Sequence, residues 1–242
     1  MLVLSLAALL LTAPPVPTGT ELVQQMRARY DGKWYRTLTF VQTTHLYGPT
    51  PRTETWYEAA RIPGLLRIDV APVDSGKTIF FRNDSIYQTK AGAVAVSRAF
   101  VHPLMVLGFD VYLDPVEKTV ARLQGLGFDL TKVHETTWQG AAVYVVGALA
   151  GDTTSKQFWV EKERLLFVRM LEPVPDGSGR VSVTQFNRYE PLGQGWIAVE
   201  VVFTVGGQVR MKEEYAAVRG DVVLPEVLWD PARYGRPGWV QP

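Results

Sequence analysis

The chain has 242 residues, of which 47% are hydrophobic and 20% charged, and its formal net charge is +1. This amount of apolar material can bury a sizeable core, which excludes a disordered chain. Lysine and arginine are scattered among acidic residues and form no basic stripe, so nucleic acid is not an expected partner. The sequence has no cysteine, which excludes disulfides, thiolate metal ligands, a cysteine nucleophile and a lipid-modified N-terminal cysteine.

The first segment, residues 1–13, is almost wholly apolar and ends in small residues. It is too short to span the roughly 30 Å of a bilayer core, and the pattern predicts a secretory signal peptide. A buried N-terminal strand or helix is the alternative. Residues 14–20, rich in Pro, Thr and Gly, are expected to form a spacer, and residues 21–242 a single domain.

One short helix and then a series of strand-like segments are predicted after the spacer. Thr18 followed by Glu21 fits a capping box, and apolar residues recur at helical spacing as far as Tyr30, which predicts an amphipathic helix. Strand-like segments then follow, separated by turn residues; they cover residues 34–47, 53–62, 65–71, 77–82, 85–89 and 93–97. Because the connections are short, each strand must turn back antiparallel to its predecessor.

An apolar, helix-like stretch from 100 to 126 interrupts the strands. His102 precedes Pro103 at the expected start of its first helix, where a structural role is the simplest reading. Asp114 and Pro115 have the pattern of an N-cap and a first-turn proline for the second helix. Asp110 and Asp114 are therefore read as a solvated residue and a cap rather than as a catalytic carboxylate pair.

Strand-like segments resume after this stretch, at residues 132–138, 142–149, 156–161, 165–171, 180–189, 196–205 and 208–218. The tail from residue 224 is proline-rich, and Trp229 and Trp239 are available to pack it against the body. The whole pattern predicts a mainly β fold. We expect a strongly curved antiparallel sheet, an unclosed half-barrel of about 11 strands, with a few short helices acting as a lid.

The sequence gives little sign of catalysis. Its three histidines, His45, His102 and His134, lie far apart without a neighbouring metal ligand, so no metal and no cofactor are expected. No serine lies in a nucleophile-elbow pattern. We therefore expect no enzyme; a hydrolase would require two carboxylates facing each other across a wet cleft.

Several segments of the N-terminal half resemble the LolA-like lipoprotein carriers, namely LTFVQTT at 38–44, WY at 56–57, RIPGLLRID at 61–69, GKTIFF at 76–81 and DSIY at 84–87. The resemblance spans residues 21–90. It implies an unclosed barrel whose concave face, covered by helices, receives the acyl chains of a lipoprotein or another lipid. It also implies a periplasmic location, and a membrane-bound donor or acceptor protein as a possible partner.

The expected function is thus a soluble periplasmic carrier, or chaperone, that takes a lipoprotein or lipid towards the outer membrane. The alternative is a periplasmic sensor or assembly domain of the same fold that engages an envelope protein through a strand edge. The large apolar residues on strands, with an apolar cover, are expected to line the ligand groove: Leu38, Phe40, Trp56, Ile68, Phe81, Leu104, Met105, Leu107, Val168, Met170, Val201 and Phe203. Leu107→Asp is expected to weaken binding and leave the fold intact.

Overall fold

The computed structural model describes residues 15–233 and 238. The predicted signal peptide lies outside the described residues, as does Trp239. The helices are α1 (Gly19–Arg29), α2 (Pro103–Gly108) and α3 (Val116–Gly125), with 3-10 turns η1 (Val73–Ser75), η2 (Asp110–Tyr112) and η3 (Glu226–Trp229). The strands are β1 (Thr37–Leu46), β2 (Arg52–Arg61), β3 (Leu65–Val70), β4 (Thr78–Arg82), β5 (Ser85–Lys90), β6 (Ala93–Ala99), β7 (Val133–Trp138), β8 (Ala141–Val146), β9 (Gln157–Glu161), β10 (Leu166–Pro173), β11 (Val181–Leu192), β12 (Gly195–Val205) and β13 (Gln208–Gly220).

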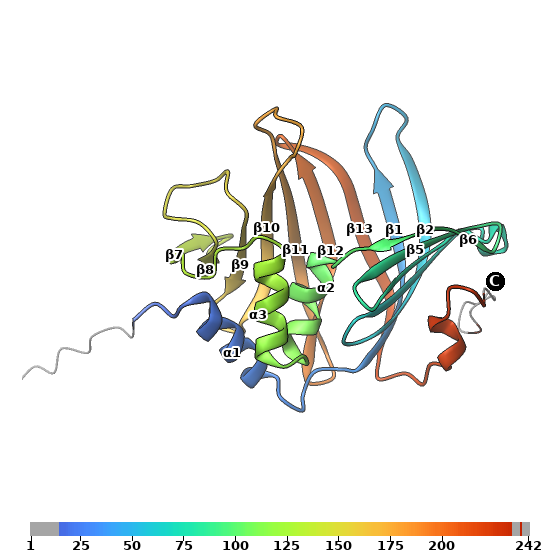
Figure 1. Ribbon diagram of the computed structural model, residues 1–242, viewed down its shortest axis with the longest axis horizontal. Coiled ribbons are helices and arrows are strands. Elements are labelled where there is room, and N and C mark those ends of the chain that lie inside the picture. The colour runs from blue at the N-terminus through green and yellow to red at the C-terminus, as the bar shows by residue number, and fades with distance from the viewer. Residues whose placement is uncertain (1–14, 234–237, 239–242) are drawn as a thin grey trace, which may run out of the picture.

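All 13 strands belong to one antiparallel sheet, in the order β6-β5-β4-β3-β2-β1-β13-β12-β11-β10-β9-β8-β7. All neighbouring strands in this order are consecutive in the sequence except β1 and β13, the first and last strands, which pair with each other. The strands β6 and β7 are edges, so the sheet curves without closing into a barrel (Figure 1). The predicted fold class is confirmed. The strand number exceeds the expected total of about 11, because every strand-like segment of the sequence forms a strand of its own.

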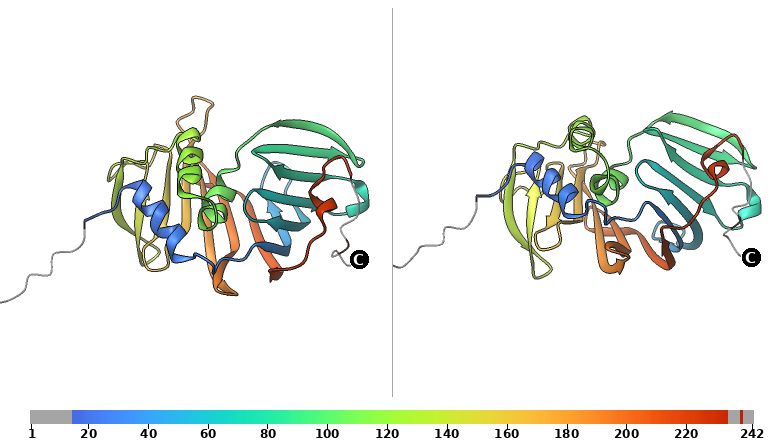
Figure 2. Two further views of the ribbon diagram at one scale, coloured as in Figure 1. Left: turned by 60° about the horizontal axis from the view of Figure 1, so that its bottom comes forward. Right: turned by 90° about the horizontal axis from the view of Figure 1, so that it is seen from below.

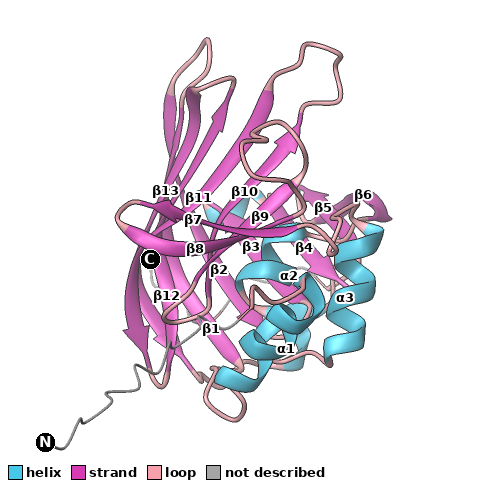
Figure 3. Ribbon diagram, turned by 90° about the vertical axis from the view of Figure 1, so that its left-hand side faces the viewer, coloured by secondary structure: helices cyan, strands magenta, loops and turns pink. Residues whose placement is uncertain are grey.

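The three helices lie together on the concave face of the sheet, in front of β10 and the strands next to it (Figures 1 and 2). Seen from the β7 edge, they form one layer packed against the sheet (Figure 3). Leu22 and Met26 of α1, Leu107 of α2 and Leu123 of α3 are completely buried in the main core. The helices fill the concave face over β8 to β11, which we call the helix-covered half.

The predicted capping box of the first helix is confirmed. The Thr18 hydroxyl accepts a hydrogen bond from the Glu21 backbone N–H at 3.2 Å, and the Glu21 carboxylate accepts one from the Thr18 N–H at 2.7 Å. The helix begins at Gly19, inside the segment expected to be a spacer. A side chain at Gly19 would meet the Leu130 carbonyl oxygen at 2.8 Å, so this start of α1 is fixed against the chain that leads into β7.

The readings of Asp110 and Asp114 were wrong. Both residues are buried, at 2% and 3% exposure, and neither caps a helix, because α3 begins after Pro115 without a side-chain cap. Arg122 contacts both carboxylates, at 3.2 and 2.9 Å, and also contacts Asp84 at 2.9 Å. Asp110 in turn accepts a hydrogen bond from the Gly64 N–H at 3.0 Å. The Arg122 cluster (Asp84, Asp110, Asp114 and Arg122) therefore ties the helices to the β2–β3 and β4–β5 turns.

The C-terminal segment packs on the convex face of the sheet. Leu228 and Trp229 of η3 form a small buried cluster with Ala59 of β2. Next to them, Arg67 and Asp69 form a fully buried ion pair at 2.7 Å. Figure 2 shows this segment at the end of the sheet away from the helices, on the outer side of the curve. The predicted packing of Trp229 against the body is confirmed, and the segment adds nothing to the concave face.

Candidate functional site

A cavity of about 260 Å³ lies on the concave face, between the sheet and α2. Its walls come from β1 to β4 and from β11 to β13, and α2 with its neighbours closes one side. We call this region the cavity half of the molecule. Its lining is mostly apolar and consists of Leu38, Phe40, Gln42, Trp56, Glu58, Ala60, Ile62, Leu66, Ile68, Ile79, Phe81, His102, Leu104, Met105, Phe109, Phe186, Val201, Phe203, Met211, Glu213 and Tyr215.

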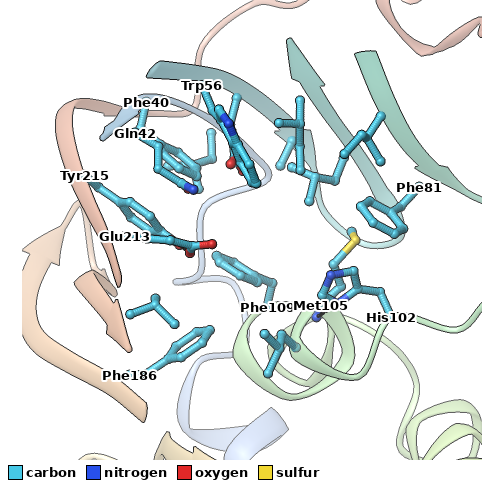
Figure 4. Close-up of a pocket in the computed structure, with 18 of the residues that line it drawn as sticks. Phe40, Gln42, Trp56, Phe81, His102, Met105, Phe109, Phe186, Glu213 and Tyr215 are labelled. Atoms are coloured by element: carbon cyan, nitrogen blue, oxygen red, sulfur yellow. Dashed lines mark hydrogen bonds between the residues drawn. The ribbon is translucent and has the colours of Figure 1, made fainter. Parts of the chain in front are cut away.

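The cavity arises from strand alternation and from the position of α2. On β1, Leu38, Phe40 and Gln42 point to the concave face because side chains alternate along a strand. The helix α2 lies close to the sheet at Gly108, where a side chain would meet the Phe186 ring at 2.8 Å. Figure 4 shows Phe40, Trp56 and Tyr215 on one side of the open space and Phe81, His102 and Met105 on the other. The helix thus closes one side of the cavity without filling it.

Nine of the twelve predicted ligand-binding residues line the cavity, namely Leu38, Phe40, Trp56, Ile68, Phe81, Leu104, Met105, Val201 and Phe203. The seven that lie on strands face the cavity because of the alternation that the sequence displays, and Leu104 and Met105 come from α2. That these side chains contact a ligand stays a prediction.

The other three predicted residues do not line the cavity. Leu107 is completely buried in the main core and is absent from the cavity lining. Met170 is on the concave face but lies in that same core. Val168 packs against Val143 and Val145 in a separate cluster. A register shift between Phe167 and Arg169 explains this last case, because a bulge moves the following side chains to the other face.

Four polar side chains at one end of the cavity were missed: Gln42 on β1, Glu58 on β2, and Glu213 and Tyr215 on β13. The strands β2 and β13 are the two neighbours of β1, so all four lie on the same wall. The Tyr215 hydroxyl donates a hydrogen bond to the Glu213 carboxylate at 3.0 Å, and its ring stacks on Phe40 at 4.3 Å. The sequence carried a signal for them, because Trp56, Glu58 and Ala60 alternate with Tyr57 and Ala59, and Met211, Glu213 and Tyr215 alternate likewise.

Burial shifts the protonation of this end of the cavity. It raises the pKa of Glu213 to about 7, against hydrogen bonds from Tyr215 and Gln42 that lower it. Burial, and then the nearby charge of Glu213, raise the pKa of Glu58 well above its usual range. Both shifts favour the protonated carboxyls, so at neutral pH this end of the cavity carries less than the full charge of two carboxylates. The Glu58 and Glu213 end of the cavity is therefore polar and weakly negative, and the rest of the lining is mostly apolar.

His102 lies at the opposite end of the cavity, at the start of α2. Its ring accepts a hydrogen bond from the Met105 N–H at 3.4 Å and packs edge-on against Phe81 at 4.5 Å. Burial lowers the pKa of His102 to about 4, so the ring is neutral at pH 7. The predicted helix start is confirmed, and the ring caps α2 while forming part of the cavity wall.

Two other features bear on the chemistry. Among residues 15–233 and 238, no group of three or more His, Asp or Glu side chains is arranged to hold a metal ion. In the same part of the chain, no helix has the length and apolarity needed to span a bilayer. The carboxyls of Glu58 and Glu213 lie on one apolar wall, which differs from the wet, two-sided cleft that a carboxylate hydrolase requires.

Searches against protein-family models and against curated proteins found no match for the sequence. Solved structures do match. A DUF1329 family protein from Desulfovibrio piger ATCC 29098 has a TM-score of 0.61 at 14% identity, covering 88% of this chain and 95% of its own. A putative outer membrane lipoprotein-sorting protein domain from Vibrio parahaemolyticus has a TM-score of 0.60 at 14% identity, covering 88% and 96%.

A LolA superfamily protein from Nitrosomonas europaea has a TM-score of 0.54 at 9% identity, covering 89% of this chain and 98% of its own. The fold is LolA-like. The similarity extends over nearly the whole of each solved chain, so the LolA-like resemblance of residues 21–90 holds for the architecture well beyond those residues. At these identities the comparison establishes the fold and leaves the ligand open.

Proposed function

We propose that this protein is a soluble periplasmic carrier, without enzymatic activity, that binds an acyl chain of a lipoprotein or lipid in its cavity and takes it towards the outer membrane. The observation that carries the proposal is the apolar cavity of about 260 Å³ beneath α2. Small-molecule sites usually occupy roughly 300 to 1,000 Å³. The volume of this cavity lies just below that range, so the cavity has room for one chain rather than several.

The energetics require no catalyst. Burying one methylene group gains about 0.8 kcal/mol, so a chain of about 12 to 16 carbons gains on the order of 10 kcal/mol before the cost of ordering it. The lining suits this task, because Met105 and Met211 are flexible side chains that adapt to ligands of different shape. A membrane-bound donor or acceptor protein fits this role as a partner.

Extraction of native lipid tests the proposal. The full chain is purified from its producing cells without detergent and extracted with organic solvent, and the extract is analysed by mass spectrometry. We expect acyl-chain compounds at a constant ratio to protein. An extract free of such compounds, together with no binding of a fluorescent fatty acid by the delipidated protein, would contradict the proposal.

A second candidate function is an interaction domain that engages an envelope protein through a strand edge. The observation that favours it is β6, an edge strand whose seven residues are all exposed, Val94 and Val96 among them. Unpaired backbone groups on such an edge can accept a strand from another protein. A stable protein partner in crosslinking, combined with indifference to added lipid, would favour this candidate over the carrier.

A further inference from the structure

The cavity has an acidic polar end, and the described residues that line it include no lysine or arginine. Its titratable residues are Glu58, Glu213, Tyr215 and His102. His102 lies apart from the acids, on α2, and is neutral at pH 7. The two glutamates are 5% and 8% exposed. These two acids therefore face the cavity with no positive charge from the lining to balance them.

Glu58 in particular lacks a partner. Among the described residues, its carboxyl forms no hydrogen bond and no ion pair, whereas Glu213 accepts a hydrogen bond from Tyr215. Buried polar groups in folded proteins are nearly always paired, because an unpaired one loses its water without a replacement. A carboxyl that is more than nine-tenths buried, unpaired and on a cavity wall is expected to meet a group of the ligand.

The chemistry of this end favours an amine. A carboxyl that gives up its proton to an arriving ammonium group becomes a carboxylate, which only accepts hydrogen bonds, and the ammonium group offers three N–H donors. Hydrogen bonds between charged partners are roughly twice as strong as neutral ones. The rings of Phe40, Trp56 and Tyr215 lie on the same side of the cavity (Figure 4), and aromatic faces attract cations. An anionic head group would instead lie beside two acids.

We propose that the cavity binds a single-chain amphiphile whose amino group pairs with Glu58 and Glu213, while its hydrocarbon chain runs along the apolar wall beneath α2. This inference rests on the proposed carrier function and narrows its ligand to a cationic, amine-bearing lipid. At neutral pH the ammonium group takes the place of a proton held by these carboxyls, so binding releases that proton to solvent.

The test compares three probes with the same chain: dodecylamine, dodecanol and dodecanoate. Each displaces a polarity-sensitive fluorescent probe from the delipidated full-length protein, below its aggregation concentration. We expect dodecylamine to bind about tenfold tighter than dodecanol, with dodecanoate the weakest. Calorimetry in buffers of different ionisation enthalpy is expected to detect proton release with dodecylamine and none with dodecanol.

Variants locate the effect. Glu58→Gln and Glu213→Gln remove the charge without changing shape, and each is expected to bring dodecylamine to parity with dodecanol. Glu214→Gln is the matched control, because Glu214 neighbours Glu213 on β13 but pairs with Lys212 at 3.2 Å outside the cavity lining. It is expected to retain the preference. Dodecylamine and dodecanol binding equally to the wild type, or a preference that survives Glu58→Gln, would overturn the inference and leave the carrier function standing. Failure of all three probes to bind would overturn both.

Discussion

The helix-covered half and the cavity half are parts of one sheet with similar side chains, yet only the first is filled. Over β8 to β11, Phe158 and Phe167 are completely buried in a core to which α2 and η2 add Leu107 and Tyr112. Over β1 to β4, the side chains are as large, but α2 covers only their border and leaves about 260 Å³ unfilled. The two halves differ in how much of the sheet the helices cover, and not in the size of their side chains.

On the proposed carrier function, this contrast gives stability to the helix-covered half and ligand binding to the cavity half. Interior atoms in the helix-covered half have close neighbours on every side, so their removal leaves a cavity that costs free energy. Side chains around the existing cavity already lack neighbours on one side, and changes there have less to disrupt. Substitutions can therefore separate folding from ligand binding, in the order of effect given below.

The largest expected effect comes from Leu107→Asp. The side chain is 0% exposed in the helix-covered core, and a buried carboxylate without a partner costs at least about 4 kcal/mol. The variant is expected to be unfolded or severely destabilised in urea titrations, contrary to the expectation from sequence that its fold stays intact. Leu104→Asp, on the same helix but in the cavity wall, should fold and lose affinity for fatty-acid probes. Equal stability of the two variants would break the distinction between the halves.

The next effect concerns the Arg122 cluster, which joins the two halves. Arg122→Met leaves Asp110 and Asp114 buried without their shared cation, which is expected to cost about 3 kcal/mol in free energy of unfolding. Lys118→Met is the matched control on α3, because Lys118 also contacts Asp114 but is about half exposed; its cost should be within about 1 kcal/mol. Chemical denaturation of both variants checks this, and a similar small loss in each would contradict the joining role.

A pH dependence follows from the buried acids. Burial raises the pKa of Glu213 and of Asp110 to about 7, whereas in the unfolded chain such groups titrate near 4. Between these values the folded protein holds protons that the unfolded chain has released. Stability must therefore fall as pH rises from about 4 through about 7. For Glu213, whose carboxyl has an ordinary pKa of 4.5, the loss is about 3 kcal/mol.

Glu213→Gln is expected to remove that share of the slope when urea unfolding is measured from pH 5 to pH 8, and to be the more stable protein at pH 8. Glu214→Gln, whose side chain ion-pairs outside the cavity, should keep the wild-type slope. Unchanged slopes in both variants would show that Glu213 is ionised throughout this range. A stability gain in Glu213→Gln would also indicate that the acidic end is retained at a cost to folding.

The strand pattern of the whole sheet could be predicted from the sequence, because turn residues divide short runs of β-branched and aromatic residues and no long-range information is needed. The same alternation predicts the concave position of the seven strand residues among the nine that line the cavity. It failed at Val168, where a bulge reverses the face of the strand. Bulges depend on how the partner strand pairs, which the local sequence does not specify.

The cavity itself could not be predicted, because it depends on where α2 lies relative to the sheet. Leu104 and Leu107 are three residues apart on one short helix, yet one lines the cavity and the other is core. The burial of Asp110 likewise depends on Arg122, which arrives from the next helix. The positions of Glu58 and Glu213 on the cavity wall could have been predicted, because both residues continue the alternation of an apolar face. The prediction considered only large apolar residues and therefore omitted them.

The smallest expected effect on stability, and the most direct test of the account, comes from filling the cavity. Ile68 is 7% exposed and lines its wall on β3, so Ile68→Trp directs an indole into the open space. Val94→Trp on the exposed β6 edge is the matched control. We predict that a fluorescent fatty acid binds the wild type and Val94→Trp alike. Ile68→Trp should lose this binding while its free energy of unfolding stays within about 1.5 kcal/mol of the wild type. Undiminished binding by a folded Ile68→Trp would place the ligand elsewhere and contradict the central claim.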